Sequence, residues 1–328
     1  MELFSYARVD NAAAAVKQVA EHEHAKFLGG GTNLLDYMKL DVETPKHLVD
    51  INSLPLNQIE VTDSGVRIGA LVRNTELAYH EAIRQKYPVL SEALLAGATP
   101  QIRNMATVGG NLLQRTRCTY FRDTCWSCNK RQPGSGCAAL EGYNRSHAIL
   151  GTSDKCIATH PSDMCVALCS LDAVVETLGP QGKRRIPLNE FYVAYGTDPA
   201  KENVLQGNEL IVAVELPNAG VYAHSHYLKV RDRASFEFAL VSVAAALEIH
   251  NGKIAGVRLA LGGVATKPWR ATEAETALVG QAASEAEYLK AANVALQNAK
   301  PQKHNGFKIE LTRRAIVRTL TELTAPKV

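Results

Sequence analysis

All seven cysteines of this sequence lie in one segment, between Cys118 and Cys169. Thiolates bind metal ions and iron–sulfur clusters, and a chain of 328 residues does not need a disulfide framework. This crowding predicts a metal or redox site. Cys125-x-x-Cys128 has the spacing of a zinc site, which is one alternative. Cys165 and Cys169 are one helical turn apart in an apolar pattern, which indicates buried thiols and not ligands.

A glycine-rich turn at 29–33, Gly-Gly-Gly-Thr-Asn, stands between an apolar run and a helical pattern. Glycine lets a backbone approach a phosphate, and a helix start offers free amides to an anion. The turn is neither the dinucleotide fingerprint, because Leu34 replaces its last glycine, nor a P-loop, because it lacks the lysine. Taken alone, it is weak support for phosphate binding.

Two more segments place polar groups at the start of a helix or a turn. Residues 102–111 end in a glycine pair and a side-chain amide, and Asp163 follows His-Pro-Ser at the start of a helical pattern. Read singly, Asp163 is an ordinary helix cap, and Ile211 and Lys229 are ordinary strand residues.

The composition is typical of a soluble globular protein. Hydrophobic residues make up 46% and charged residues 21%, and no apolar run is long enough to cross a bilayer. A net charge of +3 without a basic stripe argues against a nucleic-acid partner. The first residues lack the basic and apolar regions of a signal peptide, so we expect no export signal of the chain's own.

Periodicity predicts an α+β chain. A composition shift near 217–222, after an apolar strand, indicates a domain boundary there and gives domains at 1–218 and 219–328. Asp10 or Asn11 is expected to cap the first helix, and Ala13 is expected to face inward. Asn251-Gly252 predicts a tight hairpin. The expected helices cover 12–21, 32–40, 87–96, 163–169, 272–278, 285–298 and 311–323. The expected strands cover 25–28, 47–51, 66–71, 173–178, 183–187, 210–216, 238–249 and 253–261. Residues 118–156 show no periodicity, and such a long loop usually binds something.

The two glycine segments and the His-Pro-Ser-Asp segment, in this order and separation, resemble the FAD-binding subunits of the xanthine dehydrogenase and carbon monoxide dehydrogenase family. This resemblance covers nearly the whole chain. It implies a flavin domain of the vanillyl-alcohol oxidase or molybdopterin dehydrogenase type, followed by a small C-terminal α+β domain. It also implies FAD contacts at these residues: Lys26, Phe27, Leu28, Gly29, Gly30, Gly31, Thr32, Asn33, Leu34, Thr107, Gly109, Gly110, Asn111, Asp163, Ile211 and Lys229.

The insertion at 118–156 resembles the exceptional members of the family whose flavin subunit carries a 4Fe-4S cluster, namely 4-hydroxybenzoyl-CoA reductase and bacterial periplasmic aldehyde oxidoreductase. By this resemblance the metal ligands are Cys118, Cys128, Cys137 and Cys156. Cys125 is the doubtful fifth candidate. Arginines beside Cys118 would offset the negative charge of the cluster.

The resemblance further implies a heterotrimer in which a large molybdenum-cofactor subunit oxidises aldehydes to carboxylic acids and a small 2Fe-2S subunit relays electrons to this FAD. Export to the periplasm would then occur with a partner; otherwise the chain would be cytoplasmic. No nucleophile–base pair is recognisable, which fits electron transfer. Two other hypotheses are a self-contained flavin oxidoreductase and a non-enzymatic scaffold stabilised by a metal.

Overall fold

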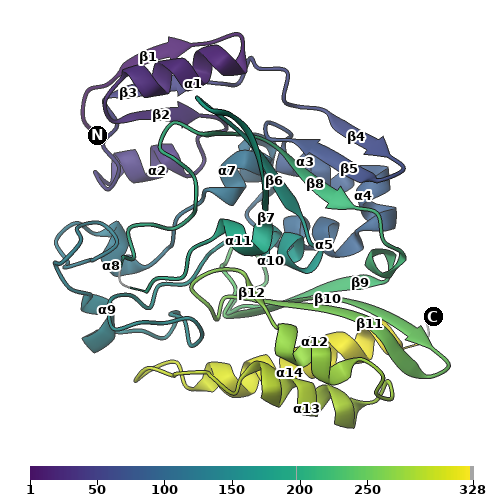
Figure 1. Cartoon of the computed structure of the whole chain (residues 1–328). Coiled ribbons are helices and arrows are strands. Elements are labelled where there is room, and N and C mark those ends of the chain that lie inside the picture. Colours follow the sequence, from purple (N-terminus) through teal and green to yellow (C-terminus); the bar gives the residue numbers. More distant parts are fainter. Residues whose placement is uncertain (197, 326–328) are drawn as a thin grey trace.

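The computed structural model describes residues 1–196 and 198–325, which form three sheets with helices packed on them (Figure 1). The N-terminal sheet is parallel, in the order β1-β3-β2. The elements of this part are β1 (Ser5–Arg8), α1 (Ala12–Glu21), β2 (Ala25–Leu28), α2 (Leu34–Lys39) and β3 (His47–Asp50).

Local chemistry accounts for the start of α1. Of the two expected caps, it is Asn11 whose side chain accepts a hydrogen bond, 2.8 Å long, from the amide of Ala14. Ala15, Val16 and Val19 form the buried face against the parallel sheet. The expectation for Ala13 was wrong: it is exposed because it lies on the opposite side of the helix from Ala15.

A five-stranded antiparallel sheet follows, in the order β4-β5-β8-β6-β7. Its strands are β4 (Ile59–Thr62), β5 (Gly65–Gly69), β6 (Val174–Gly179), β7 (Gly182–Pro187) and β8 (Leu210–Pro217). Helices between β5 and β8 in the sequence include α3 (Asn74–Tyr79), α4 (Glu81–Lys86), α5 (Pro88–Ala96), α6 (Pro100–Met105), α7 (Val108–Leu112), α10 (Asp163–Ser170) and α11 (Leu188–Phe191). The largest buried cluster joins this sheet to the helices of that group.

The third sheet is antiparallel, in the order β12-β11-β10-β9, and three helices cover its lower face in Figure 1. Its elements are β9 (Ser225–Val230), β10 (Val241–His250), β11 (Lys253–Gly262), β12 (Trp269–Arg270), α12 (Thr272–Leu278), α13 (Glu285–Ala295) and α14 (Phe307–Thr324); a 3-10 turn, Gly220–Ala223, precedes β9. The expected Asn251-Gly252 hairpin is confirmed, because both residues adopt positive φ.

Small residues let α10 approach the upper face of this sheet. A Cβ on Gly262 would lie 2.5 Å from Val166 of α10, and Ala244 and Ala246 of β10 are fully buried in the same cluster. This close packing sets the first residue of α10, Asp163, near Lys229 of β9.

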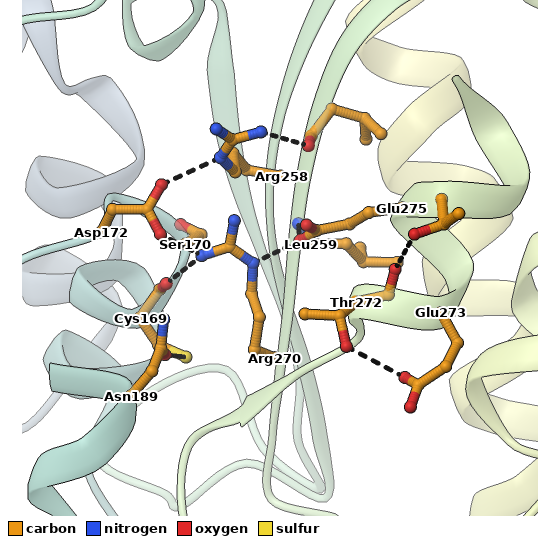
Figure 2. A network of polar contacts seen from close by, with 12 residues as sticks. Cys169, Ser170, Asp172, Asn189, Arg258, Leu259, Arg270, Thr272, Glu273 and Glu275 are labelled. Carbon is orange, nitrogen blue, oxygen red and sulfur yellow. Dashed lines mark hydrogen bonds and ion pairs between the residues drawn. The ribbon is translucent and has the colours of Figure 1, made fainter. Parts of the chain in front are cut away.

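An ion-pair network also joins α10 to β11, β12 and α12 (Figure 2). Arg270 contacts Asp172 at 2.8 Å, the carbonyl of Cys169 at 2.7 Å, and Glu275. Arg258 contacts the second oxygen of Asp172 at 2.9 Å. Burial acts to raise the pKa of Asp172, but Arg270 and its other partners lower it, so the network stays ionised.

The segment 118–156, which lies at the left of Figure 1, is not wholly irregular as its sequence suggested. Two short helices, α8 (Thr119–Arg122) and α9 (Ala138–Glu141), and a bridge between Cys128 and Cys137 interrupt it. These elements are too short to produce a visible period. Among the described residues, no helix is long and apolar enough to span a membrane.

Candidate functional site: a continuous cleft and a cysteine segment

Two adjoining cavities follow the glycine segments. The smaller has an empty volume of about 730 Å³ and the larger about 1400 Å³, and both are lined by Thr32, Asn33 and Gly110. The smaller also takes in Lys26, Phe27, Leu28, Gly30, Gly31 and Leu34. The larger extends over Asn111, Asp163 and Lys229 to the loop that carries Phe236 and Phe238. Together they form one elongated cleft.

The first glycine segment presents a run of unpaired amides to this cleft. None of the backbone amides of residues 29–34 donates to a carbonyl of any described residue. The side-chain Nδ2 of Asn33 is also buried without a partner, while its Oδ1 accepts from the amide of Arg115 at 3.1 Å. A run of successive free amides suits an anionic ligand, and the buried Nδ2 of Asn33 is costly unless something accepts from it.

The two glycine segments touch each other backbone to backbone. A Cβ added to Gly30 would lie 1.9 Å from the carbonyl oxygen of Met105. Gly109 fits less tightly, because an added Cβ would lie 3.2 Å from the Cβ of Ala70. Gly30 is therefore required by a contact within the protein, whatever the ligand. Gly110 differs, because a Cβ there would meet only Thr107 Oγ1, at 3.0 Å, and Gly110 lines both cavities.

Thr107 and Asn111 shape the second glycine segment. Thr107 Oγ1 caps α7 by accepting a 3.2 Å hydrogen bond from the amide of Gly110. Asn111 Oδ1 accepts a 2.7 Å hydrogen bond from the hydroxyl of Ser162, which itself caps α10 at Cys165. The second glycine segment and the start of α10 are thus fixed to each other.

Asp163 and Lys229 form an ion pair in the wall of the larger cavity. Their Oδ2 and Nζ are 2.7 Å apart, and the side chains are only 10% and 4% exposed. The hydroxyl of Tyr227 donates to the other carboxylate oxygen at 2.7 Å. Burial raises the pKa of Tyr227 well above its usual value, so it stays a donor.

Four side chains that line the larger cavity carry a buried polar atom without a partner among the described residues. These atoms are Asn33 Nδ2, Asn74 Oδ1, Arg103 Nε and Arg117 Nε. Since native proteins pair nearly all buried polar groups, these atoms indicate that the cleft takes a polar ligand. Three of these atoms are donors, which fits a ligand that carries phosphate and other oxygen acceptors, and Asn74 Oδ1 is an acceptor.

The cysteine segment gathers four thiols without closing them into a site. Burial first, and then neighbouring thiols, raise the pKa of Cys118 to about 12 and that of Cys156 to about 11. Cys128 is a neighbour of both, and Cys137 is a neighbour of Cys128 and Cys156. Cys125 is exposed and is absent from these interactions. Even so, no group of three or more potential metal ligands is assembled among the described residues.

Charged side chains hold this segment against the rest of the fold. Lys130, whose side chain is fully buried, contacts Glu202 at 2.8 Å and stacks over Tyr195. Glu202 also accepts from Arg115 at 3.2 Å. His147 Nε2 lies 3.1 Å from the sulfur of Cys118. Burial lowers the pKa of His147 to about 4, so the imidazole is neutral at physiological pH.

Comparison with known proteins decides the family. Residues 2–219 match the FAD binding domain in molybdopterin dehydrogenase, and residues 226–323 match the CO dehydrogenase flavoprotein C-terminal domain. The chain is 55% identical over 327 residues to the aldehyde oxidoreductase FAD-binding subunit PaoB of Escherichia coli (strain K12), covering 99% of each chain. The chain belongs to the FAD-binding subunits of the xanthine dehydrogenase family.

Other relatives agree with this assignment. The glyceraldehyde dehydrogenase medium chain of Sulfolobus acidocaldarius is 29% identical, with 97% of this chain and 95% of that one covered. A solved carbon monoxide dehydrogenase from Hydrogenophaga pseudoflava superposes with a TM-score of 0.76 at 26% identity, covering 98% of this chain and 96% of that one. The predicted family, the predicted fold type and the assignment to the oxidoreductases are confirmed.

The fold of this FAD-binding subunit brings most of the predicted flavin residues to one cleft. Gly29 and Gly109 line neither cavity and act as packing residues beside it. Ile211 is also outside both cavities: it is a residue of β8, 3% exposed in the core and paired with Thr177 of β6. Sequence reasoning missed Asn74, Arg103 and Arg117 as cavity residues, because only the tertiary fold leaves their polar atoms unpaired.

Proposed function

We propose that this subunit binds FAD along the cleft, with the pyrophosphate at residues 29–34 and the flavin beside Asp163 and Lys229. The unpaired amides of 29–34 are the observation that carries the proposal. FAD, when bound, supplies two-electron and one-electron redox chemistry. The chain's own task is to bind and orient the cofactor: the ion pair fixes polar groups in the wall, and Phe236 and Phe238 border the outer end.

We propose further that the segment 118–156 binds a 4Fe-4S cluster through Cys118, Cys128, Cys137 and Cys156. The free thiols of all four, their mutual proximity and the exposure of Cys125 support this set. The zinc alternative through Cys125 and Cys128 has less support, since Cys128 is buried and Cys125 lies at the surface. Such a cluster would supply one-electron transfer, and the contact between His147 Nε2 and the Cys118 sulfur is of a kind that influences its potential.

In the complete complex, we propose, a molybdenum-cofactor subunit oxidises aldehydes and a 2Fe-2S subunit passes the electrons to this chain. The 55% identity to an aldehyde oxidoreductase subunit supports the aldehyde substrate. The division into domains at 1–218 and 219–328, the heterotrimer, and a periplasmic location reached with a partner belong to the same proposal.

Two measurements test the cofactors. The purified chain should show flavin absorbance and about four irons in anaerobic preparations. Gly110→Val, which adds a side chain at the cleft, should remove the flavin and leave the iron unchanged.

Val279→Ala, at an exposed position in the C-terminal domain, is the control. Full flavin occupancy in Gly110→Val would contradict the placement, zinc in place of iron would exclude the cluster, and turnover by the chain alone would favour a self-contained oxidoreductase.

A further inference from the structure

Asn52 lies behind the first glycine segment, outside both cavities. Its Nδ2 donates to the carbonyl of Gly29 at 3.0 Å and comes within 3.4 Å of the carbonyl of Leu28. The same Nδ2 donates to Asp50 Oδ1 at 2.7 Å, and Asn52 Oδ1 accepts from Arg73 Nη2 at 3.2 Å. One side-chain amide thus contacts the glycine segment, a carboxylate and a guanidinium.

Charged neighbours fix the orientation of this amide. Asp50 can only accept when it is ionised, and Arg73 can only donate, so a flipped Asn52 would lose both contacts. Burial acts to raise the pKa of Asp50, but hydrogen bonds from Tyr6 and from Asn52 lower it. Asp50 therefore stays ionised, and the NH₂ group of Asn52 remains directed at the glycine segment.

The direction of a carbonyl also fixes the direction of the amide that follows it. The chain has no cis peptide among its described residues, and in a trans peptide the C=O and the following N–H point in opposite directions. The carbonyl of Leu28 accepts from the amide of Ile51 at 3.1 Å and the carbonyl of Gly29 accepts from Asn52 at 3.0 Å. The amides of Gly29 and Gly30 therefore point away from these two neighbours. Neither amide has an acceptor among the described carbonyls, and Gly30 lines the smaller cavity.

Arg73 extends the same contact to the second glycine segment. Its Nη1 donates to the carbonyl of Met105, the oxygen that a Cβ on Gly30 would strike. This carbonyl would otherwise present a partial negative charge next to Gly30 and the proposed phosphate site. Arg73 pairs with it and also brings a positive charge behind the loop.

We infer that Asn52 and Arg73 are positioning residues for FAD, which hold the two glycine segments in register so that the amides of 29–30 face the pyrophosphate. This inference rests on the proposed flavin function. The two residues are coupled, since Asn52 Oδ1 loses its donor when Arg73 is removed, and Arg73 Nη2 loses this acceptor when Asn52 is removed.

The test is titration of the full-length chain, freed of flavin, with FAD. Asn52→Leu and Arg73→Met should each raise the Kd by about tenfold, and the double variant should raise it little further, because the pair acts together. Arg73→Lys should behave like Arg73→Met, since one ammonium cannot bridge Met105 and Asn52 in the same way. Asn57→Leu, an exposed asparagine in the same loop, is the matched control.

A positioning role requires that the flavin-free variants keep the melting temperature of the parent chain to within about 2 °C and keep its iron. An unchanged Kd in Asn52→Leu, while Gly110→Val loses flavin, would overturn this inference and leave the flavin site intact. Rescue of the Kd by Arg73→Lys would also overturn it, because charge alone would then suffice. Unchanged flavin binding in all of these variants, Gly110→Val included, would remove the flavin placement and the inference together.

Discussion

The glycine segments and the cysteine segment are ordered by different means. Gly30 packs directly on the backbone of Met105 and Gly109 packs on Ala70, so contacts within the protein shape the cleft without a ligand. The cysteine segment instead has two helices of four residues each, and charged side chains such as Lys130 tie it to the fold. Its thiols are neighbours but do not form a closed ligand set. A preformed site needs its ligand only for function, whereas the proposed cluster would also complete the structure of the cysteine segment.

The largest expected effect separates the ligand cysteines from their neighbour. Cys128→Ser should lose nearly all of the iron and much of the protein, because a cluster that lacks one thiolate becomes labile. Cys125→Ser should keep about four irons per chain, since Cys125 is exposed and outside the group. Iron content by anaerobic analysis is the measurement. The reverse result would show that the ligand assignment is wrong, although an iron–sulfur site would survive.

Lys130→Met tests whether charge holds the cysteine segment. Removing the ammonium leaves Glu202 buried with only Arg115 as a charged partner, and breaking a buried pair costs about 3–5 kcal/mol of unfolding free energy. Denaturant unfolding with iron content as a second readout is the measurement. Lys201→Met, an exposed lysine next to Glu202, is the control. Equal stability of the two variants would mean that packing, and not charge, orders the segment.

Cys169→Ala distinguishes a buried thiol from a ligand. Cys169 is 2% exposed on α10, and its sulfur lies 2.9 Å from Asn189. Loss of this small group should lower the unfolding free energy by roughly 1 kcal/mol and leave iron and flavin unchanged. Loss of iron from this variant would extend the metal site into α10 and remove the contrast between the two regions.

The smallest effect is expected at His226, which belongs to neither region. Its ring contacts Glu92 of α5 at 2.8 Å and Glu322 of α14 at 3.1 Å, and chiefly Glu92 raises its pKa. A raised folded-state pKa means that the added stability is complete below the unfolded value near 6.5 and is lost as pH rises through the folded value.

We therefore expect the unfolding free energy to fall by about 0.5 kcal/mol as pH rises from about 6 to 8, a small figure because the pair is partly exposed and screened. His226→Gln should flatten this change in denaturant titrations, with flavin and iron contents unaffected. A steeper pH dependence in the variant would contradict the assignment.

The sequence predicted those elements whose pattern is long and local. α1, β2, the β6–β7 hairpin and the β10–β11 hairpin all appear close to their expected bounds. β1 and β4 were missed because they have four residues each and their burial does not alternate. β9, which has six residues, was also missed. Most of the helices between β5 and β6 were also missed, because helices of four to six residues are too short to show a clear period.

The residues of the candidate site likewise fall into those with a local sequence signal and those that depend on the tertiary fold. The glycine segments are visible because glycine is chemically distinctive, and the family resemblance supplied Asp163 and Lys229. Arg103 and Asn74 could not be found, since a polar side chain becomes an unpaired group only when the fold removes its partners. Ile211 shows the opposite case, a position carried over from the family that this fold places in the core.

The residues that line the larger cavity run from Thr32 to Phe238. The cleft needs both the segment near Thr32 and the segment near Phe238 in place. Contacts between segments so far apart in sequence form slowly, because a long loop must be closed first. Flavin capture is therefore expected to be a late step in the maturation of this subunit. Newly made chains would pass through a stage in which the N-terminal parallel sheet has folded, while the strand that carries Lys229 has not yet packed against the cleft.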